Sequence, residues 1–246
     1  MYIYLIPTPL CAVNPLRVLP PITIEVIYSL SIFFVENAKT ARAFLREVEH
    51  PLPIKEVTFY SFDKHANPKE EVREILVKLK NNNVSSCGVL SEAGYPCVAD
   101  PGSILINEAH CMNMKVIPLI GPSSLILALV ASGLPGQQFT FHGYFPHENS
   151  ARIKLFDYIE GTRLHTHQFI ETPYRTLSRF QSLMLELKPT TLLSIASNLT
   201  SSSEKIFTQS VKNWKKNSLE NNDSTKLNGG FFLPHKEPTI FSIACM

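Results

Sequence analysis

The sequence predicts an α/β protein with two domains. Over the first 120 residues, short apolar runs alternate with stretches of helical spacing, which is typical of a parallel sheet covered by helices. After Pro135-Gly136 the pattern changes and strand-like alternation becomes more frequent. We therefore expect a parallel α/β domain over residues 1–120 and a mixed-sheet α/β domain over residues 121–246.

Five apolar runs in the first half have the length of buried strands. They lie at residues 2–6, 32–35, 57–60, 87–90 and 115–119. Four stretches between them have helical spacing, at residues 22–31, 38–48, 68–80 and 104–112. The third of these helices has Pro68 at the favoured first position and acidic residues in its first turn.

The second half predicts further strands and helices. We expect strands at residues 139–145, 167–170 and 190–196, and helices at residues 151–160 and 174–187. Residues 205–214 fit a strand followed by a helix, but their pattern does not decide between these states. Residues 217–230 are rich in Asn, Ser, Asp and Gly, as in an exposed loop, and residues 231–233 and 239–243 resemble a closing hairpin.

Composition limits the class of protein and its partners. With 246 residues, 44% hydrophobic and 18% charged, the chain can bury one large or two modest cores. A net charge of +2 neither supports nor excludes a nucleic-acid partner. Five widely spaced cysteines without a C-x-x-C pair fit a reduced, cytoplasmic protein. No His/Cys/Asp cluster has metal-ligand spacing, so no metal is expected.

One uncharged stretch, residues 116–134, is nominally long enough to span a bilayer. However, Pro118, Gly121 and Pro122 divide it into a strand, a turn and a short helix over residues 123–132. Ten helical residues cover only about 15 Å. We therefore expect a buried helix and no membrane association. The N-terminus also lacks the pattern of a signal peptide, which again favours the cytoplasm.

Two turns rich in glycine and proline predict a ligand site. Residues 91–102 and 120–124 each follow an expected strand and precede an expected helix, and Pro7-Thr8-Pro9 follows the first strand. Open α/β sheets bind ligands at this carboxyl edge. The turns lack the G-x-G-x-x-G, Walker A and G-x-S-x-G patterns, which argues against a dinucleotide enzyme, a P-loop NTPase and an α/β-hydrolase.

These segments resemble the tetrapyrrole methylase superfamily, and most closely its 16S rRNA (cytidine-2′-O)-methyltransferase branch. The matching motifs are Pro7-Thr8-Pro9, residues 91–102, residues 120–135 with Gly133-Leu134-Pro135, and Gly143-Tyr144-Phe145-Pro146. The resemblance implies two α/β domains with S-adenosylmethionine (SAM) in the cleft between them. It also implies a homodimer and methylation of a ribose 2′-hydroxyl in small-subunit ribosomal RNA.

The resemblance also implies which residues hold SAM. Pro9 would line one wall, and Gly94, Tyr95 and Pro96 match a tripeptide that wraps the methionine portion. Ser123 and Ser124 match a Thr-Ser pair of the superfamily. The second domain would hold the adenosine with Glu171, Thr172, Ala196, Pro238 and Thr239.

Deprotonation of a ribose hydroxyl calls for a general base, because the hydroxyl is a weak nucleophile. Glu36, Glu92, Asp100 and Glu171 are candidates because they follow expected strands or lie in the turns, and we favour Asp100 and Glu36. An alternative interpretation of Asp100 is a cap on the following helix.

The chain departs from the branch pattern on the expected substrate side. The segment after Pro9 lacks its usual glycine, Glu36 is followed by Asn-Ala-Lys in place of Asp-Thr-Arg, and residues 196–201 lack the usual charges. Two alternatives therefore remain open: C-methylation of a tetrapyrrole, and a SAM-binding module with little catalytic activity.

Overall fold

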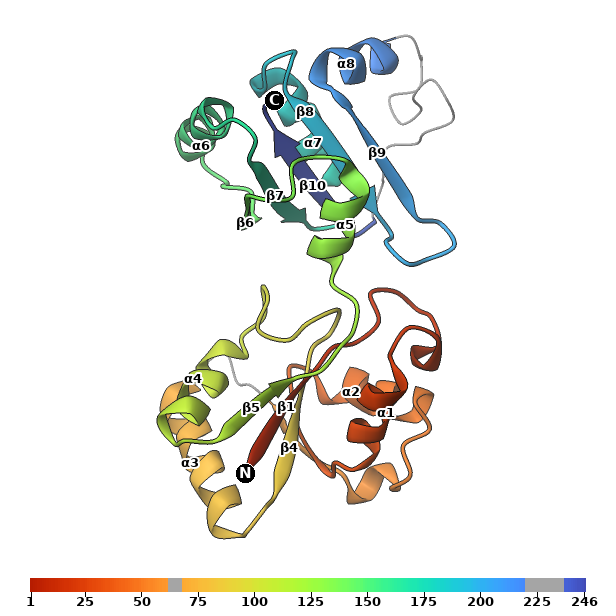
Figure 1. Cartoon of the computed structure of the whole chain (residues 1–246), viewed down its shortest axis with the longest axis vertical. Coiled ribbons are helices and arrows are strands. Elements are labelled where there is room, and N and C mark those ends of the chain that lie inside the picture. The colour runs from red at the N-terminus through yellow and green to blue at the C-terminus, as the bar shows by residue number, and fades with distance from the viewer. Residues whose placement is uncertain (62–67, 220–236) are drawn as a thin grey trace. The chain divides into compact units, whose positions relative to one another are not determined.

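The computed structural model describes residues 1–61, 68–219 and 237–246. The chain divides into two compact units, Met1–Ser123 and Ser124–Met246. Each unit contains one five-stranded sheet flanked by helices (Figure 1). The predicted α/β class with two sheets is therefore confirmed.

The sheet of the first unit is entirely parallel. Its strands are β1 (Tyr2–Ile6), β2 (Ile32–Val35), β3 (Thr58–Ser61), β4 (Ser86–Leu90) and β5 (Lys115–Pro118), in the order β3-β2-β4-β1-β5. Each strand lies within one or two residues of its predicted range. Because all five run in one direction, the loops that follow them leave the sheet at the same edge.

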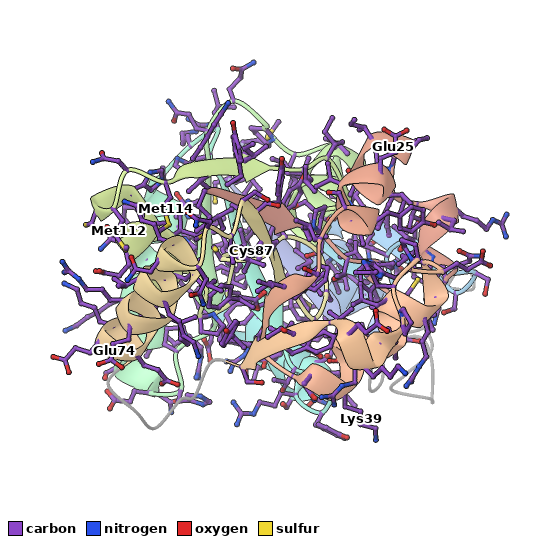
Figure 2. All side chains as sticks on the ribbon, turned by 90° about the horizontal axis from the view of Figure 1, so that it is seen from below. Glu25, Lys39, Glu74, Cys87, Met112 and Met114 are labelled. Carbon is purple, nitrogen blue, oxygen red and sulfur yellow. The ribbon has the colours of Figure 1, made fainter. Side chains whose placement is uncertain are left out.

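Helices cover both faces of this sheet. They are α1 (Pro21–Tyr28), α2 (Ala38–Glu47), α3 (Pro68–Asn81) and α4 (Ser103–Cys111), with short 3-10 helices at Pro15–Arg17 and Ile54–Glu56. Ile27 of α1 and Phe44 of α2 pack with Phe33 on one face, while Leu76 of α3 and Leu105 of α4 pack on the other. Figure 2 shows Cys87 of β4 in the interior, with Glu25 and Lys39 toward the periphery on the side of α1 and α2.

The second unit has a mixed sheet. Its strands are β6 (Phe139–Tyr144), β7 (Thr166–Glu171), β8 (Leu192–Ser197), β9 (Lys205–Ser210) and β10 (Thr239–Ala244), in the order β6-β7-β10-β8-β9. Strands β6 and β7 are parallel, and the other neighbours are antiparallel. The structure thus decides the open assignment at residues 205–214, which form β9 and the start of a helix.

One face of the second sheet carries the core of this unit. The helices are α5 (Ser124–Ser132), α6 (Asn149–Gly161), α7 (Thr176–Glu186) and α8 (Val211–Leu219). Phe169 and Phe241 of the sheet pack with Phe180 of α7 and with Trp214 of α8, whose Nε1 donates to Leu193 O at 2.9 Å. Helix α5 packs against β8, β9 and β10, and Gln168 Nε2 donates to the carbonyl of its Leu125 at 3.0 Å.

Two predictions near the end of the chain need correction. Residues 217–219 belong to α8 and not to a loop, because Val211 and Trp214 anchor this helix in the core. Residues 220–230 and 231–233 lie outside the described residues. Strand β10 is paired on both edges, with β7 and β8, so it is a central strand of the sheet. None of the helices in the described ranges combines the length and the apolar character needed to span a membrane.

Three imidazoles stack on one another: His142 lies on β6, His165 directly precedes β7 and His167 lies on β7. His142 Nε2 and His167 Nδ1 lie 2.9 Å apart, and the rings of His165 and His167 stack with their centroids 4.5 Å apart. Burial lowers the pKa of His167 to about 4, and the neighbouring imidazoles His165 and His142 add to this effect. Burial and His165 also lower the pKa of His142. The rings of His142 and His167 are therefore neutral near pH 7.

We expect the free energy of unfolding to fall as the pH drops from about 6.5 toward 4. In this window the unfolded chain binds a proton at His167 that the folded chain does not, which costs about 2 kcal/mol at about pH 5. Urea denaturation at about pH 7.5 and about pH 5 measures this loss. His167→Gln should show a smaller loss than the wild type, and an equal loss in the two proteins would contradict the assignment.

Candidate active site

The turn after β1 and the loop after β4 are joined at the carboxyl edge of the first sheet. Thr8 N donates to Gly94 O at 2.9 Å, and Gly94 N donates to Thr8 O at 3.1 Å. Thr8 Oγ1 also donates to Ser91 O at 3.2 Å. Two of the predicted ligand-binding segments, separated by more than eighty residues, thus form one surface.

The turn at residues 120–124 also reaches this surface. Gly121 N donates to the hydroxyl oxygen of Tyr95 at 3.1 Å. A Cβ at Gly94 would lie 3.2 Å from Leu10 Cδ2 and 3.6 Å from Pro122 O. Gly94 also has a φ of +76°, a conformation that side chains disfavour. The local packing therefore calls for glycine at the point where the three segments approach one another.

The loop at residues 91–102 is held by its own polar groups. Ser91 Oγ donates to Asp100 Oδ2 at 2.6 Å. Between them, Cys97 and Ala99 have positive φ values of 69° and 62°, which are unusual for residues with a side chain. The N-cap of α4 is Gly102, and no side chain forms a capping hydrogen bond at this helix start. Asp100 therefore does not cap α4. The capping interpretation of Asp100 is therefore wrong, and its carboxylate fixes the loop instead.

The cysteines of this region do not suit nucleophilic catalysis. Burial raises the pKa of Cys97 to about 11, and the nearby Asp100 carboxylate contributes in the same direction. Burial also raises the pKa of Cys87 to about 12. Since the thiolate is the reactive form, both thiols are inert near neutral pH.

The two favoured general-base candidates lie on loops that follow neighbouring strands. Glu36 is half-buried and directly follows β2, while Asp100 lies in the loop that follows β4. Strands β2 and β4 are paired, with Phe34 opposite Val89. After Glu36, Asn37 caps α2 by accepting from Lys39 N at 2.9 Å. Both carboxylates are therefore at the same edge of the sheet.

A pocket of about 240 Å³ lies beside α2 at this edge. Its walls come from the turn after β1, from α2 and from the ends of β2 and β4, and they include Thr8, Pro9, Thr40, Phe44, Leu90 and Glu92. Thr40 Oγ1 donates to Glu92 Oε1 at 2.7 Å and joins α2 to the loop after β4. Thr40 and Phe44 were not predicted from the sequence. The small residues Ala41 and Ala43 beside them could have indicated that this side of α2 borders a pocket.

The predicted residues of the second unit gather at one end of its sheet. In β10, Thr239 lies opposite Glu171 of β7 and opposite Ser197 of β8, next to Ala196. The hydroxyls of Thr239 and Ser197 are 3.0 Å apart. Pro238 directly precedes β10 and is exposed, and Thr172 directly follows β7. Ser123 is the last residue of the first unit, and Ser124 begins α5.

The Glu171 carboxylate is occupied by interactions within the second unit. Its Oε2 lies 3.2 Å from Arg179 Nε, and its Oε1 accepts from Thr172 N at 2.8 Å. The side chains of Glu171 and Arg179 are only 1% and 10% exposed. Arg179 also lies over the ring of Phe145, 4.8 Å from its centroid. These contacts orient the residues after β7 and favour a positioning role for Glu171.

Among the described residues, no group of three His, Cys, Asp or Glu side chains is arranged to hold a metal ion.

Curated proteins with one shared name are similar to this chain. Proteins named "Ribosomal RNA small subunit methyltransferase I" are 28% identical over 198 residues in Buchnera aphidicola subsp. Baizongia pistaciae and 31% identical over 169 residues in Haemophilus influenzae. These matches cover 80% and 68% of this chain, and 64% and 58% of the relatives. The chain thus spans somewhat less than two thirds of the length of these relatives. No family model matches the chain.

Solved structures share the fold at low sequence identity. The methyltransferase CobJ aligns with a TM-score of 0.59 and 13% identity, covering 99% of this chain and 92% of that chain. The native form of uroporphyrin III C-methyl transferase from Thermus thermophilus aligns with a TM-score of 0.53 and 13% identity, covering 99% and 97%. Together with the sequence relatives, these matches confirm the resemblance: the chain has the tetrapyrrole methylase-like fold and is a homologue of the proteins named Ribosomal RNA small subunit methyltransferase I.

Proposed function

We propose that this protein is a SAM-dependent methyltransferase that modifies a ribose 2′-hydroxyl of small-subunit ribosomal RNA. The observation that carries the proposal is the similarity to the ribosomal RNA small subunit methyltransferase I proteins over most of the chain. The joined turns at the carboxyl edge of the first sheet support it, since this is where α/β sheets hold ligands.

The residues of the first unit fit the chemistry of SAM. Gly94 has no side chain and a positive φ, and a Cβ there would be tightly packed against Leu10, so the bare backbone of this loop can approach a ligand closely. Glu92 and Asp100 supply carboxylates on this loop, and carboxylates favour a nearby positive charge. We assign Pro9, Gly94, Tyr95, Pro96, Ser123 and Ser124 to the methionine portion.

The residues of the second unit fit an adenosine. Ala196 is small and buried, and it offers an apolar contact with adjacent backbone groups of β8, which suits a planar base. Glu171, Thr172, Pro238 and Thr239 are assigned to the same portion. Arg179 fixes the Glu171 carboxylate and thereby the direction of the backbone at Thr172.

Catalysis in this proposal depends mainly on alignment. SAM supplies a methyl group on a positively charged sulfur. The protein holds the acceptor hydroxyl in line with that methyl group, and good alignment alone provides a large part of the rate. Asp100 and Glu36 are the proposed general bases. The hydroxyl of Ser91 donates a hydrogen bond to Asp100 and so orients its carboxylate. Serine is uncharged, so this contact leaves the charge of the carboxylate unpaired by a cation.

The assembly and location also belong to the proposal. We assign a homodimer from the resemblance, and a cytoplasmic location because five free cysteines fit a reducing compartment.

Transfer of tritiated methyl groups tests the proposed reaction. Small ribosomal subunits from a strain that lacks the related methyltransferase are incubated with the protein and labelled SAM, and the RNA is digested to nucleosides. We expect label on one 2′-O-methylated nucleoside. Label on an added tetrapyrrole instead of the RNA would support the C-methyltransferase alternative. SAM binding by calorimetry without any transfer would support a binding module.

A further inference from the structure

The loops that follow β6 and β7 contact each other. The two strands are parallel neighbours, so both loops leave the second sheet at the same edge (Figure 1). Arg175 Nη1, in the loop after β7, lies 3.2 Å from Nε2 of His147, in the loop after β6. The loop after β7 begins with Thr172, which is assigned above to the adenosine. The contact between the two loops therefore adjoins the proposed cofactor site of this unit.

Buried contacts hold the bases of both loops. The guanidinium of Arg179 pairs with Glu171 at the end of β7 and lies 4.8 Å from the ring centroid of Phe145, which directly follows β6. In the loop after β7, Arg175 N donates to Thr172 O at 2.9 Å and closes a turn. The exposed residues of these loops therefore project from a fixed support, which is what a binding site needs.

Tyr174 presents its ring beside the contact between the loops. Its exposed fraction is 84%, and it lies between Pro173 and Arg175 in the sequence. An exposed tyrosine ring offers a large flat surface at little cost in conformational freedom. Every nucleobase has a flat face that can stack on such a ring. Tyr174 is therefore suited to contact an unstacked base.

Arg175 adds an available positive charge next to this ring. Its side chain is exposed, and among the residues that the structure describes it pairs with no carboxylate, although Glu148 directly follows His147 in the sequence. Histidine carries no negative charge, so its contact leaves the charge of the guanidinium uncompensated. A guanidinium has five N–H donors, and contact through Nη1 leaves others for a phosphate.

A flat ring next to an unpaired guanidinium matches one nucleotide of a single strand. The base can stack while the phosphate accepts from the guanidinium, as in proteins that bind unpaired RNA. The adenosine of SAM is the other flat ring proposed for this edge. It carries no phosphate, however, and the residues assigned to it are in contact with the sheet itself, such as Ala196 and Thr239. The combination of ring and charge therefore favours the RNA.

We infer that Tyr174 and Arg175 form a subsite for a nucleotide that flanks the methyl acceptor in the RNA strand. The base stacks on Tyr174, and the phosphate binds Arg175. The inference rests on the proposed methyltransferase function and adds a contact outside the acceptor position. Because stacking tolerates any base, this subsite positions the strand without reading its sequence.

Tyr174→Leu tests the stacking contact, because it keeps an apolar side chain and removes the ring. We expect KM for small subunits to rise by roughly 10-fold, which is the effect of losing one stacked base. The dissociation constant of SAM, measured by calorimetry, should stay within about 2-fold of the wild type. Tyr174→Trp should keep the KM of the wild type, since an indole also stacks.

Two results would overturn this assignment. A loss of SAM affinity in Tyr174→Leu that equals the rise in KM would place the adenine of SAM on the ring. A KM as high in Tyr174→Trp as in Tyr174→Leu would show that stacking is not involved.

Leu185→Ala is the matched control on the same helix. Leu185 lies in the last turn of α7 and is 85% exposed, as much as Tyr174, but it is far along the helix from the loop contact. We expect its KM for small subunits to equal that of the wild type. A rise as large as that in Tyr174→Leu would reject the subsite, since any exposed apolar residue of this helix would then have the same effect.

Arg175→Gln tests the phosphate contact, because it removes the charge and keeps a hydrogen-bond donor. The slope of log binding constant against log salt concentration for single-stranded RNA should become shallower by roughly 0.7. Lys154→Gln, which removes an exposed charge on α6, should leave the slope unchanged. An unchanged slope in Arg175→Gln, or an equal change in both variants, would reject the phosphate contact.

RNA binding without SAM distinguishes failure of the inference from failure of the proposed function. The probe is a fluorescein-labelled single-stranded oligouridylate, and its binding is followed by anisotropy. Binding that Tyr174→Leu weakens by roughly 10-fold and Tyr174→Trp retains supports the subsite, even if no label reaches the small subunits. Equal binding by wild type and Tyr174→Leu, or no binding by the wild type, rejects the subsite whether or not methyl transfer occurs.

Discussion

Gly94→Val is expected to fold and to lose SAM affinity by about 100-fold or more. A β-branched residue is strongly disfavoured at the φ of +76° that Gly94 adopts. Its Cβ would also lie 3.2 Å from Leu10, and further methyl groups would enter the space between the loop and Pro122. The loop can relieve this strain by moving, which displaces the backbone assigned to the cofactor. Calorimetry with SAM and circular dichroism measure binding and folding.

Gly133→Val is the control for this variant. Gly133 also has a positive φ, +69°, but nothing lies within 4 Å of a Cβ at that position. The two variants therefore share the backbone cost and differ in the crowding near the proposed site. We expect Gly133→Val to bind SAM normally despite some loss of stability. Normal SAM affinity in a folded Gly94→Val protein would refute the assignment of this loop to the cofactor.

Arg179→Met is expected to lower the free energy of unfolding by about 3 kcal/mol. The substitution leaves the Glu171 carboxylate, whose side chain is 1% exposed, without its cationic partner. It also removes the guanidinium that lies over Phe145. Urea denaturation followed by tryptophan fluorescence measures the change, because Trp214 is buried in the same core as Phe145.

Lys188→Met provides a matched comparison. Lys188 Nζ lies 3.2 Å from Glu160, but its side chain is 68% exposed. The Glu160 carboxylate also keeps hydrogen bonds from Lys188 N and from Thr191 Oγ1. We therefore expect Lys188→Met to lower the free energy of unfolding by less than about 1 kcal/mol.

Adding Glu171→Gln to Arg179→Met should recover part of the lost stability, because it removes the unpaired buried charge. If Arg179→Met and Lys188→Met lower the free energy of unfolding by the same amount, burial of the Arg179–Glu171 pair contributes little to stability.

Most of the fold was predictable because its strands are short apolar runs bounded by turn residues. Strand β2 is an example, since Ile-Phe-Phe-Val is buried and ends directly before Glu36. Pairing was harder to predict than the strands themselves. The range of β10 was recognised, but its neighbours β7 and β8 lie far back in the chain, so a hairpin was the wrong choice. Local patterns specify strands, whereas long-range packing specifies their partners.

The candidate site shows the same division. The turns at Pro9, Gly94 and Gly121 were expected to meet because the carboxyl ends of parallel strands share one edge. The pocket beside α2 was not expected, since it depends on the contact between Thr40 and Glu92, which are distant in the sequence. The role of Asp100 was also beyond local reasoning, because a helix cap and a contact with Ser91 fit the same sequence.

The position of β1 between β4 and β5 has a consequence for the order of folding. Tyr2 pairs with Ser86 of β4 and with Lys115 of β5, so β1 has no partner until the later strands of this unit have been synthesised. Closing so long a loop slows folding relative to a chain with local contacts. The bridge between Thr8 and Gly94 extends the pairing of β1 with β4. A nascent chain would therefore acquire the edge that we propose to bind SAM in the same step that pairs β1 with β4.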